Sequence, residues 1–158
     1  MKVVSDTSPI LYLILIDASH LLPTLFGRII IPTTVERELV HPSAAEAVRH
    51  TISERPAWLE VRPSPSAAAS DELTPLHTGE RDAILLADSI SADLLILDER
   101  RARRAAIQRG QKVIGLLGIL MQGAKRGLVD LDDAITRLQA TNFRLDPALI
   151  DMVRPRSS

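Results

Sequence analysis

Short aliphatic runs that alternate with helical stretches constrain the fold of this chain more than any other feature. The clearest run is Leu94–Leu97, which is continuously apolar and directly precedes Asp98. Such a run is typical of a strand covered on both faces, because the strands of a parallel sheet lie between layers of helices. Val3–Val4 and the isoleucines of Arg28–Pro32 are similar runs. The pattern predicts a parallel sheet with right-handed crossover connections.

The remaining patterns complete this prediction. Trp58–Arg62 alternates and predicts an edge strand, Lys112–Ile114 predicts a further short strand, and Pro63–Ser70 predicts a loop beside the cleft. Helices are expected at about residues 8–16, 18–26, 34–41, 44–54, 79–91, 99–109, 115–126, 131–140 and within 143–153. We expect one three-layer α/β/α domain over residues 1–153, followed by a disordered tail at 154–158.

The composition excludes several classes of protein. Aromatic residues make up 3% of the chain, which argues against a nucleic-acid surface built on aromatic stacking. The formal net charge of -1 excludes an overall basic field. There is no cysteine, which excludes zinc-thiolate sites and suits a cytoplasmic protein. No apolar segment reaches the roughly 18 residues that a membrane span requires, so no membrane partner is expected.

Two acidic residues directly follow predicted buried strands. Asp6 comes after Val3–Val4, and Asp98 comes after Leu94–Leu97. Ligands of open α/β sheets bind at the carboxyl ends of the strands, so both residues are candidates for a site. The alternative is that each carboxylate only satisfies the amides of a turn or caps the following helix.

Further acids lie at the starts of predicted helices. Glu36 and Glu38 follow the second strand, and Glu80 and Asp82 precede the apolar face of the helix at 79–91. If both helices begin at the same edge of the sheet, their acids point toward Asp6 and Asp98, and four carboxylates in total share one cleft. Hard divalent cations such as Mg²⁺ or Mn²⁺ suit such an oxygen donor set. The alternative is that these acids only complement helix dipoles.

The sequences around these acids resemble the four acidic motifs of PIN domains. The motifs are V-V-S-D-T-S-P with Asp6, P-T-T-V-E-R-E-L with Glu38, G-E-R-D-A-I-L-L-A with Asp82 and A-D-L-L-I-L-D-E-R-R-A-R with Asp98. The chain is most similar to a subgroup with an N-terminal D-T-S-P motif and a segment like 112–120 near the end. The resemblance covers about residues 2–153 and implies the PIN fold around a central parallel sheet.

The resemblance also implies an activity and a set of site residues. It implies a metal-dependent endoribonuclease, the toxin of a VapC-type toxin-antitoxin pair, neutralised by a small antitoxin protein. Asp6 and Asp98 would bind Mg²⁺ or Mn²⁺ directly, and Glu38 and Asp82 would complete the site, in part through water. Helical periodicity does not choose between Glu38 and Glu36 or between Asp82 and Glu80, so these choices follow the family pattern alone.

Two further expectations concern partners. Arg100 and Arg101 follow Asp98 closely and are expected to contact RNA phosphates, with a solvated helix face as the alternative. The apolar segment 113–121 fits core or the interface of a homodimer. The alternative function is a non-catalytic RNA-binding or receiver-like module on the same fold. A receiver normally has paired acids after its first strand, where this chain has only Asp6.

Overall fold

The computed structural model describes residues 1–65, 73–145 and 147–153, and its centre is an all-parallel sheet. The strands are β1 (Val3–Ser5), β2 (Ile29–Pro32), β3 (Leu59–Arg62), β4 (Leu94–Ile96) and β5 (Val113–Ile114). Their order across the sheet is β3-β2-β1-β4-β5. The predicted tail at 154–158 and most of the predicted loop at 63–70 lie outside the described residues.

Alternate residues of the strands enter two separate hydrophobic cores. Val3 and Ile29 belong to the core on one face of the sheet, whereas Val4 and Ile30 belong to the core on the other. The strands are therefore buried on both sides, which explains their continuous apolar runs. This arrangement confirms the predicted three-layer α/β/α fold.

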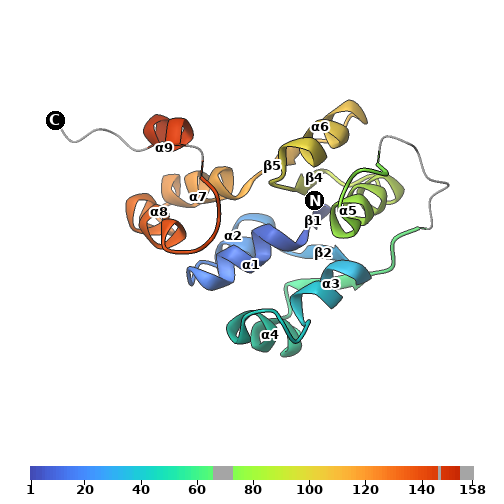
Figure 1. The fold of residues 1–158 in the computed structure, drawn as a ribbon, viewed down its shortest axis with the longest axis horizontal. Coiled ribbons are helices and arrows are strands. Elements are labelled where there is room, and N and C mark those ends of the chain that lie inside the picture. The colour runs from blue at the N-terminus through green and yellow to red at the C-terminus, as the bar shows by residue number, and fades with distance from the viewer. Residues whose placement is uncertain (66–72, 146, 154–158) are drawn as a thin grey trace.

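The helices divide between the two faces of the sheet. The first core is completed by α1 (Thr7–Leu15), α2 (Leu21–Phe26), α3 (Thr33–Leu39), α4 (Glu46–Ser53), α7 (Leu116–Lys125) and α8 (Leu131–Gln139). The second is completed by α5 (Thr78–Ser89) and α6 (Arg100–Gln108), which lie at the right of Figure 1. A last helix, α9 (Pro147–Val153), lies near α7 and α8 at the left. No helix in the described ranges is long and apolar enough to cross a membrane.

Strand pairing determines which chain segments meet at the carboxyl edge. β1 pairs with β4 in a register that places Ser5 opposite Ile96, and the amide of Asp6 donates to the Ile96 carbonyl at 3.1 Å. β1 also pairs with β2, so α3 begins at the same edge. Because α5 runs back toward the start of β4, its N-terminus lies at this edge as well.

The predicted element boundaries differ from the structure at two functional positions. The first helix begins at Thr7, so Asp6 and not Ser8 occupies the N-cap position, with an extended backbone (φ -80°, ψ 178°). The helix after β4 begins at Arg100, with Glu99 as its N-cap. Both differences affect whether Asp6 and Asp98 cap the helices that follow them.

Candidate active site

Asp6 is buried at the junction of β1 and α1. Its side chain is 5% exposed, makes no capping hydrogen bond to α1, and leaves Oδ1 buried without a hydrogen-bond partner. The pKa of Asp6 is raised to about 7, chiefly by burial and in part by the nearby carboxylates of Glu80 and Glu38, whereas the Thr7 amide and His77 act in the opposite direction. Capping therefore does not account for this carboxylate.

Glu38 approaches Asp6 across the start of α5. A Cβ atom added to Gly79 would lie 2.8 Å from Glu38 Oε1 and 3.1 Å from Asp6 Oδ1, so both oxygens face one point on the helix backbone. The hydroxyl of Thr7 donates to Glu38 Oε2 at 2.7 Å. Thr7 therefore holds one oxygen of Glu38 and leaves the other directed toward Asp6.

The N-terminus of α5 adds Glu80 to this group. The amide of His77 donates to Glu80 Oε1 at 3.0 Å in a reciprocal capping box, and His77 Nδ1 lies 3.5 Å from Glu38 Oε1. Burial raises the pKa of Glu80, and the carboxylates of Glu99 and Glu38 act in the same direction. Glu80 therefore shares the electrostatic environment of Asp6 and Glu38.

Asp82 has different neighbours. Its Oδ2 accepts a hydrogen bond from the Thr34 hydroxyl at 2.8 Å, and it lines a small cavity of about 310 Å³ together with Arg37 and Ser64. Residues two apart on a helix point in nearly opposite directions, so Asp82 and Glu80 cannot both face the same group. Asp82 therefore lies beside the start of α3, and the charge of Glu80 acts on Asp6.

Asp98 lies between β4 and α6 and is partly buried. Its Oδ1 accepts from the Leu116 amide at 2.9 Å, while Oδ2 is buried without a partner. Burial raises the pKa of Asp98, and the Leu116 amide and the Arg103 guanidinium lower it. The cap of α6 comes from Glu99, whose carboxylate accepts from the Ala102 amide at 2.9 Å, so capping does not account for Asp98 either.

Asp6 and Asp98 each have a side-chain oxygen without a hydrogen-bond partner, and these oxygens indicate a cation-binding site. Within the described residues only three buried side-chain polar atoms lack a hydrogen-bond partner, and two of them are Asp6 Oδ1 and Asp98 Oδ2. Burying an unpaired carboxylate oxygen costs several kcal/mol at about neutral pH, and hard divalent cations prefer such oxygens. The donor chemistry of the site therefore fits Mg²⁺ or Mn²⁺.

The side chains are not gathered into a complete coordination shell. In the part of the chain that the structure describes, no three His, Asp or Glu side chains are grouped closely enough to hold a metal ion. Glu38 is held by Thr7, and Asp98 Oδ1 is held by Leu116. Coordination by three or more of these carboxylates would therefore need side-chain rotation.

The two arginines expected to contact RNA differ in position. Arg100 lines a cavity that also contains Asp98, whereas Arg101 is exposed and is not among the lining residues. The sequence did not distinguish Arg103 from the neighbouring arginines, but its Nη1 would lie 2.9 Å from a Cβ on Gly115, while Asp98 Oδ1 would lie 2.8 Å from it. Arg103 follows Asp98 by five residues, and this spacing does not predict that the two side chains lie close together. The capping box from His77 to Glu80 could have indicated that Glu80 faces the helix start.

Comparison with known proteins shows the family of this chain. A family model described as a PIN domain matches residues 2–158, almost the whole chain. A search of curated proteins found no match.

Proposed function

This chain belongs to the PIN domain family, and we propose that it is an endoribonuclease that depends on a divalent metal ion. PIN domains are generally nucleases, and PIN nucleases generally use divalent metals. The observation that carries the proposal is the pair of buried, unpartnered oxygens, Asp6 Oδ1 and Asp98 Oδ2, at the carboxyl ends of adjacent strands.

We assign the metal-binding roles from the contacts of each carboxylate. Asp6 and Asp98 would hold Mg²⁺ or Mn²⁺ directly, because their free oxygens have no protein partner. Glu38 would contribute Oε1, since Thr7 already occupies Oε2. We propose Glu80 as the fourth carboxylate in preference to Asp82, because the charge of Glu80 acts on Asp6 whereas Asp82 lies beside the start of α3.

The metal would supply a hydroxide nucleophile at neutral pH and would stabilise charge on the phosphate and the leaving oxygen. The protein's own contribution is positioning. Thr7 orients Glu38, and the Leu116 amide fixes the rotation of Asp98. Gly79 leaves room for Glu38 and Asp6 to approach each other, because any side chain at that position would occupy the space between α5 and the two carboxylates.

The proposal extends to a biological role. The D-T-S-P motif at Asp6 and the segment 112–120 are similar to those of VapC-type toxins, so we assign the chain as the toxin of a toxin-antitoxin pair. Its partners would be a small antitoxin protein, an RNA substrate and a second copy of the chain. Growth arrest on expression, relieved by the product of a short adjacent reading frame, is the expected result. Expression without any effect on growth would refute the toxin role.

Cleavage of RNA by the purified protein tests the enzymatic part. Wild type is expected to cut single-stranded RNA with Mg²⁺ or Mn²⁺ and to be inactive with EDTA. Asp6→Asn and Asp98→Asn are expected to lose at least about 100-fold in rate, since each removes a charged ligand of the reacting centre. Asp17→Asn is the matched control, because Asp17 is exposed beyond α1. Full activity of both site variants would refute the assignment, and RNA binding without metal binding or cleavage would favour the non-catalytic module.

A further inference from the structure

A cavity of about 690 Å³ opens beside Asp98, between α6, β5, the start of α7, residues 143–145 and Leu149. Its size is within the usual range for sites that bind organic ligands. Asp98 lies in its wall, so the cavity shares this residue with the candidate active site. Whatever occupies the cavity therefore lies next to the proposed metal ligand.

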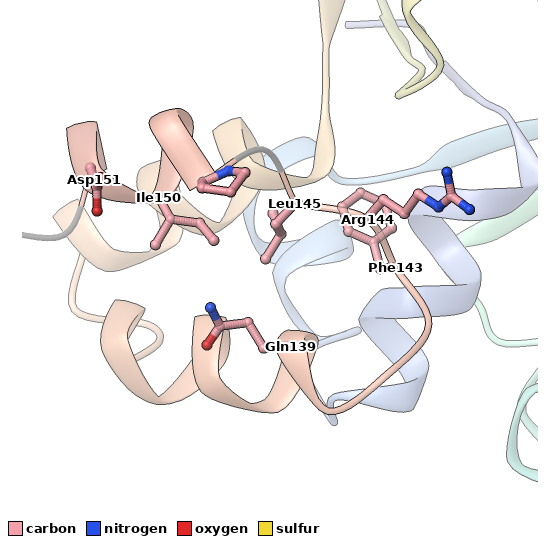
Figure 2. A pocket seen from close by; sticks show the side chains of 7 residues that line it. Gln139, Phe143, Arg144, Leu145, Ile150 and Asp151 are labelled. Carbon is pink, nitrogen blue, oxygen red and sulfur yellow. The ribbon is translucent and has the colours of Figure 1, made fainter.

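The walls of this cavity carry a strong excess of positive charge. Arg100, Arg103 and Arg104 follow helical spacing on one face of α6, and Arg144 comes from the opposite wall. Asp98 is the only acidic residue among the described lining residues. Figure 2 shows Arg144 extending away from Gln139 and Asp151, with which it also lines a second cavity. The charge is complementary to a polyanion, and arginine suits phosphate because its guanidinium can donate two parallel hydrogen bonds.

The rest of the wall is apolar and partly open to solvent. Ile107 and Leu149 are 58% and 46% exposed, and they are two of only five large hydrophobic side chains that are exposed in the described ranges. Phe143 lines the cavity beside them, and its ring is held in an edge contact with Tyr12 at 4.8 Å between centroids. Arginines around an apolar wall match the two parts of a nucleotide, a charged phosphate and a base with apolar faces.

We propose that this cavity binds a single-stranded RNA segment adjacent to the scissile phosphate. The phosphates pair with Arg100, Arg104 and Arg144, and one unpaired base lies against Ile107 and the neighbouring apolar wall. In a duplex the base faces are covered by stacking, so only a single strand can offer a base to this wall. The inference rests on the proposed function, because an RNA strand cut at Asp98 must continue past it. That continuity favours RNA over an acidic peptide, which needs no contact with the reacting centre.

Binding measurements in an inactive background test the proposal. The Asp6→Asn protein is titrated with a short fluorescein-labelled single-stranded RNA, and fluorescence anisotropy is followed at several salt concentrations. Arg104→Gln and Arg144→Gln should each weaken binding about five-fold and reduce the slope of log K against log salt by about 0.7, the value expected for one phosphate contact. Ile107→Gln should weaken binding without changing the slope. Arg55→Gln is the charge-matched control, because Arg55 is exposed after α4 and does not line the cavity.

The outcomes separate this inference from the proposed function. Cleavage by wild type, with RNA binding unchanged in all three cavity variants, would overturn the inference and leave the nuclease intact. Arginine-dependent RNA binding without metal-dependent cleavage would support the inference and refute the nuclease. Equal affinity for a duplex of the same sequence would overturn the single-strand assignment. Loss of self-association or of acidic-peptide binding in the variants, with RNA binding retained, would assign the cavity to a protein partner and overturn the inference.

Discussion

Replacing Asp6 by asparagine should stabilise the metal-free protein at alkaline pH. The side chain is 5% exposed, and Oδ1 has no hydrogen-bond partner, so the ionised form is poorly solvated in the folded state. Asparagine has nearly the same shape and no charge. The substitution therefore removes the cost of burying the charge while keeping the packing around β1 and α1.

The magnitude follows from the pKa of Asp6. Folding raises the pKa from 3.8 to about 7, so the folded protein binds more protons than the unfolded chain between these values. The free energy of unfolding should thus fall as pH rises from about 4 to 7 and then become constant. About three pKa units at 1.36 kcal/mol each give an upper value of about 4 kcal/mol above pH 7. The advantage of Asp6→Asn should be near zero at about pH 4 and approach this value at about pH 8.

Urea denaturation with EDTA, at a series of pH values between these limits, measures the effect. Asp17→Asn, at an exposed position, keeps Asp6 and should lose stability with rising pH as wild type does. Adding Mg²⁺ or Mn²⁺ at pH 8 should stabilise wild type, because the metal binds only the folded state, and should stabilise Asp6→Asn much less. The reasoning is refuted if Asp6→Asn is no more stable than wild type at pH 8, or if the difference between the two proteins is the same at every pH.

Two further substitutions test the geometry around Asp6. Gly79→Ala should weaken metal binding about ten-fold, measured by calorimetry. The added Cβ would lie 2.8 Å from Glu38 Oε1 and 3.1 Å from Asp6 Oδ1. Unchanged affinity would show that the metal does not use these two oxygens. Glu80→Gln should reduce the rate of RNA cleavage by at least about ten-fold and Asp82→Asn by less, measured at saturating Mg²⁺. The reverse order would return Asp82 to the site in place of Glu80.

The sequence alone determined the class of the fold and the two strand-end carboxylates. Continuous aliphatic runs bury both faces of a strand, and this property is local, so the parallel sheet and the positions of Asp6 and Asp98 could be predicted from it. The family motifs gave the same two residues. The order of the strands is not local, and the register that places Ser5 opposite Ile96 appears only in the folded chain.

Only the tertiary structure decided which helix residues face the site. Glu80 and Asp82 both flank the buried face of α5, and periodicity treats them alike. The choice depends on the neighbouring segments, because Thr34 of α3 takes Asp82 while Asp6 and Glu38 lie on the side of Glu80. Neighbouring segments also determine which arginines of α6 line the cavity. Residues 143–145 and Leu149 line the cavity together with one face of α6, and contacts between residues so far apart in sequence cannot be predicted from local spacing.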